Sequence, residues 1–159
     1  MISNEFLLEC EQYIKNGGIL YGAVYMPVVI PTHEAVDTKA AAEFLNDNRG
    51  LIFSQQLFYL IDKRGLKDSE VYKKAWVDRR IFSKIRGYKE YTPVKKTVIA
   101  LCMALELSRE DADLLLSSAG YSLSRADDFD LTIAFCIEKQ VYDFFEINEV
   151  LYHFGFEVF

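Results

Sequence analysis

The chain has 159 residues, of which 51% are hydrophobic and 14% aromatic, enough for one well-buried core. This composition excludes an intrinsically disordered chain, and no apolar run reaches the roughly 18 residues of a membrane-spanning helix. The net charge of −6 argues against nucleic-acid binding unless positive charge is concentrated in one region. The first residues lack the basic flank of a signal peptide, so we expect a cytoplasmic protein.

Residues 1–50 are predicted to be a small N-terminal extension. The pattern predicts, in chain order, a helix at 3–16, an edge strand or extended segment at 19–30 and a second short helix at 32–46. Gly22 and Pro27 interrupt the β-prone run, which is why it is not predicted to be a central strand. The extension is small for a core of its own, and we expect it to pack on the rest of the chain or on a partner.

The rest of the chain is helical in pattern. Residues 51–124 are predicted to form a five-helix bundle, and residues 125–159 a C-terminal helical pair packed on it. The predicted helices are 54–63, two short helices within 68–87, then 95–107, 108–119, 126–139 and 143–154. The expected fold is therefore an all-α compact helical bundle, with a strand only in the N-terminal extension.

The stretch 65–88 is predicted to be two short helices joined by a tight turn. Asp68 or Ser69 is expected to cap the first helix, and Asp78 the second. Their buried faces are predicted to carry Val71, Tyr72, Ala75, Ile81, Phe82 and Ile85. The opposite face of the second helix is basic, as in a helix that reads DNA.

Positive charge is concentrated around this stretch. Between Lys63 and Lys96 there are 12 basic and 4 acidic residues, a net charge of +8, whereas the rest of the chain carries −14. An ordinary surface mixes the two signs, so the segregation indicates a polyanionic partner. The alternative is that this is the solvated face of any helical protein.

Chemistry-bearing residues outside this region form no recognisable site. Cys10, Cys102 and Cys136 are far apart and are expected to be core residues, without a disulfide framework, a metal site or a cofactor. His33 and His153 are isolated and are expected on loops or helix surfaces. No phosphate-binding loop or nucleophile elbow occurs, so we expect no catalytic residues and no enzyme.

The segment 53–107 resembles the phage-repressor-like (Cro or XRE type) helix-turn-helix fold. The resemblance is carried by Glu70-Val71, Lys73-Lys74, Val77-Asp78-Arg79, Ser83-Lys84-Ile85 and the helix Thr97–Leu105. It implies a DNA-binding transcription regulator of a bacterial type, often a dimer. This chain departs from the pattern at the turn and the helix crossing, where Trp76 and Tyr72 replace glycine and a small residue, and we expect a different crossing.

A closer resemblance covers residues 51–155. The phrases Phe53-Ser54-Gln55-Gln56-Leu57, Asp78-Arg79-Arg80, Phe82-Ser83-Lys84-Ile85-Arg86 and Ala119-Gly120-Tyr121 are similar to a helical domain at the C-terminus of some bacterial macro-domain proteins. This resemblance implies a fold more than an activity. Residues 1–50 lack the glycine-rich loops of a macro domain itself.

If the helix pair binds double-stranded DNA, Arg79 and Arg80 are the candidates to read guanine edges. The predicted phosphate contacts are Lys73, Lys74, Lys84, Arg86, Lys89, Lys95 and Lys96. Four aromatic residues, Tyr72, Trp76, Tyr88 and Tyr91, are expected to be core residues more than stacking platforms.

Two other interpretations remain open. The chain is alternatively a protein-interaction module, because its C-terminal helices hold eight aromatic residues for a homodimer or a partner protein. These are Phe135, Tyr142, Phe144, Phe145, Tyr152, Phe154, Phe156 and Phe159. A third interpretation is that acidic residues of the first 50 or last 40 positions cover the basic helix, as autoinhibition or DNA mimicry.

Overall fold

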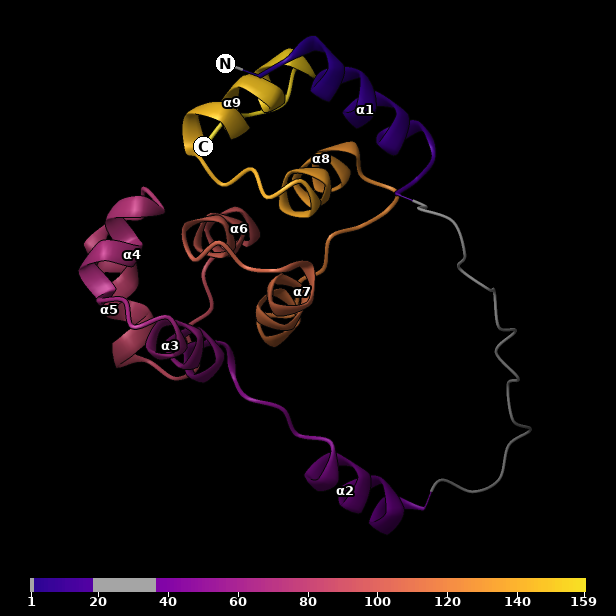
Figure 1. Cartoon of the computed structure of the whole chain (residues 1–159). Helices are drawn as coiled ribbons and strands as arrows, with labels where there is room; N and C mark the ends of the chain where they lie inside the picture. Colours follow the sequence, from indigo (N-terminus) through magenta and orange to yellow (C-terminus); the bar gives the residue numbers. More distant parts are fainter. Residues whose placement is uncertain (1, 19–36) are drawn as a thin grey trace.

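The computed structural model describes residues 2–18 and 37–159, and within these ranges the chain forms nine helices and no strand (Figure 1). The helices are α1 (Asn4–Lys15), α2 (Thr38–Asp47), α3 (Phe53–Lys63), α4 (Asp68–Lys74), α5 (Arg79–Gly87), α6 (Lys95–Ala104), α7 (Arg109–Ser118), α8 (Asp128–Glu138) and α9 (Phe144–His153). The predicted all-α bundle is confirmed. The predicted edge strand at 19–30 and the first residues of the predicted helix at 32–46 lie outside the described residues.

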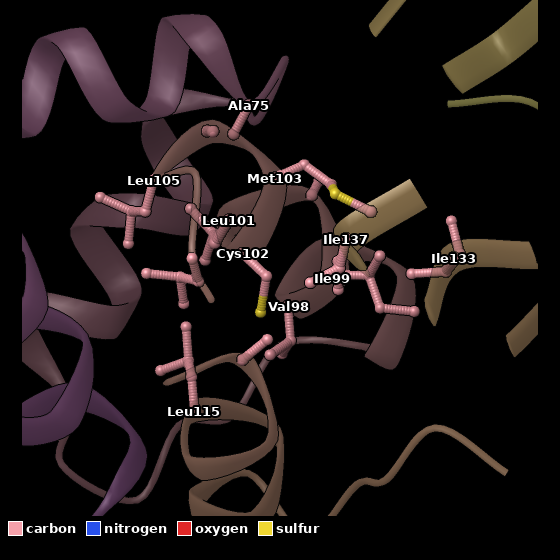
Figure 2. Packing of buried hydrophobic residues seen from close by; sticks show 14 of the residues in the cluster. Ala75, Val98, Ile99, Leu101, Cys102, Met103, Leu105, Leu115, Ile133 and Ile137 are labelled. Carbon is pink, nitrogen blue, oxygen red and sulfur yellow. The ribbon is translucent and has the colours of Figure 1, made fainter. Parts of the chain in front are cut away.

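α6 is the centre of the core. Every residue from Val98 to Ala104 is buried, so this helix is apolar on all sides and needs neighbours all round. Figure 2 shows how α6 meets its neighbours: Leu115 approaches from α7, and Ile133 and Ile137 from α8. The same buried cluster extends from Phe53 in α3 to Leu151 in α9, so the predicted bundle and the C-terminal pair share one core.

α1 packs on the C-terminal part of the chain. The ring of Phe135 on α8 lies 4.9 Å from the ring of Phe6 and 5.5 Å from that of Tyr13. Lys139 Nζ lies 2.5 Å from a carboxylate oxygen of Glu9. These contacts place α1 against α8, and the amide of Ile2, just before α1, donates to Glu149 of α9 at 3.3 Å (Figure 1).

Side-chain caps mark several helix ends, and two helix ends differ from the positions predicted from the sequence. Asp78 accepts from the amide of Arg80 at 2.6 Å, as predicted, and Ser108 caps α7 by accepting from the amide of Asp111 at 3.2 Å. The predicted cap of α4 at Asp68 or Ser69 is wrong: the N-cap is Lys67, whose amide donates to the Glu70 carboxylate at 2.7 Å. α6 ends before residue 107, because Glu106 has a φ of 50° and reverses the chain.

Candidate nucleic-acid interface

α4 and α5 form a helix pair anchored by apolar side chains. Val71 of α4, Ala75 just after it, and Phe82 and Ile85 of α5 are each no more than 3% exposed. Tyr72 packs on the same contact, with its ring 5.7 Å from that of Phe82. The predicted buried faces are therefore confirmed, and they fix which side of α5 faces solvent.

The solvent side of α5 carries a basic face, which we define as Arg79, Arg80 and Lys84. All three side chains are exposed, and Arg80 and Lys84 lie one helical turn apart. Within residues 2–18 and 37–159, no carboxylate lies within 4.0 Å of any of the three. Their charge is consequently open to an external anion.

A recess of about 350 Å³ lies between the start of α4 and α5, and Arg79 lines it. Lys67, Arg86 and Asp68 also line the recess, so three cations and one carboxylate surround it. Arg86 is held in place: its Nε donates to Asp68 at 2.9 Å, and its guanidinium lies 4.0 Å from the centre of the Phe58 ring. This arrangement fixes the guanidinium before any ligand arrives.

Lys67 is not among the contact residues predicted from the sequence, although it lies in the basic region between Lys63 and Lys96. The pattern predicted that α4 would be capped by Asp68 or Ser69, so Lys67 was expected to precede the helix. As the actual N-cap of α4 it is positioned at the edge of the recess. The signal that identifies it is the Glu70 three residues later, which is typical of a capping box.

The nine predicted contact residues do not form one surface. Four of them are paired with carboxylates of the chain itself: Lys74 with Glu106, Arg86 with Asp68, Lys95 with Asp130 and Lys96 with Glu157. Lys95 and Lys96 lie at the start of α6 and line a groove with Phe156 of the C-terminal tail. Arg79, Arg80 and Lys84 remain together on α5, with exposed Lys73 and Lys89 on α4 and after α5.

Trp76 occupies the turn between α4 and α5 in a left-handed conformation. Its φ is 55°, a region that glycine populates freely and other residues rarely enter. The indole ring lies 5.2 Å from the ring of Phe144 and 5.5 Å from that of Phe145, both in α9, and is 50% exposed. Trp76 therefore packs on α9, whereas Tyr72 packs on Phe82 of α5.

Most of the C-terminal aromatic set lies in the bundle. Phe135 and Phe144 are buried, and Tyr142, Phe154, Phe156 and Phe159 pack partly buried against the core. Phe145 and Tyr152 are 75% and 80% exposed and lie two turns apart on one face of α9. Together with Trp76 they form what we call the α9 aromatic patch. The tail is held by Asn148, which accepts from the amide of Phe159 at 2.8 Å.

A second polar cluster consists of side chains that bind one another. A pocket of about 210 Å³ between α1, α7 and α8 is lined by Tyr13, Arg109, Asp113 and Glu138. Tyr13 donates to Glu138 at 2.7 Å, and Arg109 Nε donates to Asp113 at 3.0 Å. Because these groups bind one another, the pocket is explained as a structural junction.

The histidines and cysteines lie apart from this interface. His153 is exposed on α9, whereas His33 lies outside the described residues. Cys10, Cys102 and Cys136 are buried free thiols, which confirms their prediction as core residues. In the described ranges no three His, Cys, Asp or Glu side chains are placed to hold a metal ion. None of the helices there has both the length and the apolar run needed to cross a lipid bilayer.

Comparison of the chain with protein-family models, curated proteins and solved structures gives no match.

Proposed function

We propose that the chain is a non-enzymatic regulatory protein that binds double-stranded DNA through the α4–α5 pair, used as a helix-turn-helix. The observation that supports this most is the basic face of α5. Arg79, Arg80 and Lys84 are exposed there without a carboxylate partner in the described part of the chain, although the protein as a whole is acidic. An acidic protein in which the positive charges of one helix face have no carboxylate partners is suited to bind a polyanion through that face.

The dimensions of α5 fit the major groove. Nine residues give a helix about 13 Å long, which covers about four base-pair steps. Phe82 and Ile85 hold its inner side on the core, so its outer side enters the groove as a rigid unit. Arg79 and Arg80, in the first turn, carry the bidentate donors that recognise guanine O6 and N7.

The residues that we assign to DNA contacts are fewer than the nine predicted from the sequence. We assign base contacts to Arg79 and Arg80, and phosphate contacts to Lys73, Lys84 and Lys89. Lys74, Lys95 and Lys96 bind carboxylates of the chain, and breaking those pairs would offset part of the gain from a phosphate. Arg86 keeps its hydrogen bond to Asp68. Its guanidinium therefore stays in place at the recess that Arg79 also lines.

The test is fluorescence anisotropy with a labelled random duplex of about 20 base pairs at about 50 mM salt. The wild type is expected to bind, and the double variant Arg79→Ala/Arg80→Ala to bind at least tenfold more weakly. The matched control Lys39→Ala/Arg125→Ala removes two exposed positive charges elsewhere and is expected to bind like the wild type. Equal weakening by both double variants would mean a general charge effect, and no binding by the wild type would end the proposal.

A second candidate function is a protein-interaction module, and the α9 aromatic patch supports it. Trp76, Phe145 and Tyr152 are each at least 50% exposed, and aromatic residues of this kind often contribute most of the binding energy at interfaces. In that case Phe145→Ala/Tyr152→Ala would abolish co-purification of a partner protein without changing the anisotropy titration. Loss of DNA binding in this variant would instead tie the patch to the DNA interface.

A further inference from the structure

Three hydroxyl groups line the recess between α4 and α5, together with the charged groups described above. They belong to Ser69, Tyr72 and Ser83. Ser69 and Tyr72 are partly buried on α4, and Ser83 is exposed on α5. Hydroxyl, ammonium and guanidinium groups all donate hydrogen bonds to phosphate oxygens. A recess of about 350 Å³ lined by this many donors is therefore suited to an anion that has several acceptor oxygens.

The polar residues that α5 contributes lie on one side of the helix. Arg79, Ser83 and Arg86 follow the spacing i, i+4 and i+7, which places them within about 60° of one another around the helix axis. Lys84 lies about 140° from Arg79 around the same axis and does not line the recess. Ser83 thus lies between the two arginines along α5, on a side of the helix different from that of Lys84.

The guanidinium of Arg86 is held so that one of its nitrogens is left for a ligand. Its Nε donates to a carboxylate oxygen of Asp68 at 2.9 Å, and its Nη2 donates to the same oxygen. The central carbon of the guanidinium also lies 4.0 Å from the centre of the Phe58 ring. Nη1 takes part in neither of these hydrogen bonds, so its two N–H groups can bind an anion. Because the side chain is already held, less conformational entropy is lost when it does so.

The charges that line the recess match those of a phosphate monoester. Three positive side chains and the carboxylate of Asp68 give the lining a net charge of +2. At neutral pH a phosphate monoester carries about −1.5 to −2, whereas each phosphodiester of a nucleic-acid backbone carries about −1. The balance of charge therefore favours the monoester. The volume of the recess is also typical of a small site for an organic ligand, which leaves room beside Tyr72 for the rest of the molecule.

We propose that the recess binds the phosphate group of a small phosphate monoester, such as a phosphorylated metabolite. Lys67, Ser83 and Nη1 of Arg86 donate to the phosphate oxygens. Arg79, about 10 Å from Arg86 along the helix axis, adds its charge from the other end of the recess. Arg79 is shared with the DNA contacts proposed above. The site does not depend on those contacts, because the other three residues are not assigned to DNA.

The test is a titration of the ¹⁵N-labelled full chain with inorganic phosphate at neutral pH and constant ionic strength, followed by amide chemical shifts. The amides of Lys67, Ser83 and Arg86 are expected to shift, with half-saturation at about 1 mM phosphate. Dimethyl phosphate, a diester with one negative charge, is expected to bind at least tenfold more weakly. The absence of saturable shifts up to about 20 mM phosphate overturns the proposal. Equal affinity for the two probes also overturns it, since the recess would then accept a DNA backbone phosphate.

Two matched variants separate the recess from the general charge of the helix pair. Lys67→Ala is expected to weaken phosphate binding at least threefold and to leave DNA binding unchanged in the anisotropy titration. Lys84→Ala removes one positive charge from the other side of α5, and it is expected to bind phosphate like the wild type although it weakens DNA binding. Equal weakening of phosphate binding by the two variants contradicts the proposed site. A wild type that binds DNA without binding phosphate refutes this site and leaves the DNA proposal standing. Both variants are expected to keep the thermal midpoint of the wild type, because both side chains are exposed.

Discussion

The ammonium of Lys95 lies 2.5 Å from the carboxylate of Asp130, joining the start of α6 to the start of α8. Asp130 is 3% exposed and also accepts from the amide of Ser124 at 2.7 Å. A carboxylate this deeply buried needs its positive partner, because burial of an unpaired charge is costly. The pair therefore joins the predicted five-helix bundle to the C-terminal helices.

The two partners are expected to respond unequally to substitution. Lys95→Met leaves Asp130 charged and buried and is expected to lower the free energy of unfolding by about 3 kcal/mol. Asp130→Asn keeps an acceptor for Ser124 and leaves Lys95, whose side chain is 33% exposed, access to water, so the expected loss is about 1 kcal/mol. Urea denaturation at neutral pH measures both, and a larger loss for Asp130→Asn would contradict the expected asymmetry.

Alkaline pH is expected to destabilise the fold. Burial, with a hydrogen bond to Glu138, raises the pKa of Tyr13 from 10.0 to about 12, and burial raises the pKa of the Cys10 thiol from 9.0 to about 12. The folded state thus favours the protonated forms. This stability is fully present below the unfolded-state pKa values and is lost as the pH rises towards the folded values.

Tyr13→Phe isolates the tyrosine in this response. The variant lacks the phenol group that titrates between pH 10.0 and about 12, so its urea midpoint is expected to fall less over that interval than that of the wild type. The cysteine contribution, which begins nearer pH 9.0, is expected to remain. Parallel curves for the two proteins would show that Tyr13 does not contribute.

Helix ends provide a test of backbone strain. Gln140 after α8 has a φ of 57°, and Gly120 after α7 has a φ of 77°, in equivalent reversals of the chain. The amides of Val141 and Tyr121 close these reversals by donating to Cys136 and Leu116 carbonyls at 2.8 and 2.9 Å. The same backbone geometry is thus occupied once by a favourable residue and once by an unfavourable one.

Gln140→Gly is expected to stabilise the protein by about 0.5–1 kcal/mol, because it removes the left-handed strain of a residue with a Cβ atom. Gly120→Ala is expected to destabilise by about 1 kcal/mol, although a Cβ atom there would meet no atom within 4 Å. Thermal unfolding followed by circular dichroism measures both changes. Effects of the same sign in the two variants would refute the strain argument.

Salt dependence distinguishes free from paired lysines in the proposed DNA complex. Lys84 has an exposed side chain on α5, whereas Lys74 Nζ lies 2.5 Å from Glu106. Lys84→Ala is expected to reduce the slope of log K against log salt by about 0.9, because one phosphate contact is lost. Lys74→Ala is expected to leave the slope unchanged. Equal slopes for both variants would remove Lys84 from the contact set.

Much of the helical pattern was predictable from local residues. The caps at Asp78 and Ser108 and the left-handed glycines Gly65 and Gly120 depend on neighbours within one turn, and the helices that they bound lie close to the ranges predicted from the sequence. Amphipathic spacing also identified the buried side of α5. The error at α4 came from the same local rules, because Lys67, Asp68 and Ser69 compete for one capping position.

The state of the basic residues was decided by the tertiary structure. Sequence counting treated the nine cations as equivalent, yet Glu106, Asp130 and Glu157 approach Lys74, Lys95 and Lys96 from segments at least 32 positions away. Likewise, nothing local indicates that Trp76 packs on α9 or that α2 buries none of its residues. Charge and apolar spacing are properties of the chain itself, whereas ion pairing and burial depend on which distant segments the fold brings together.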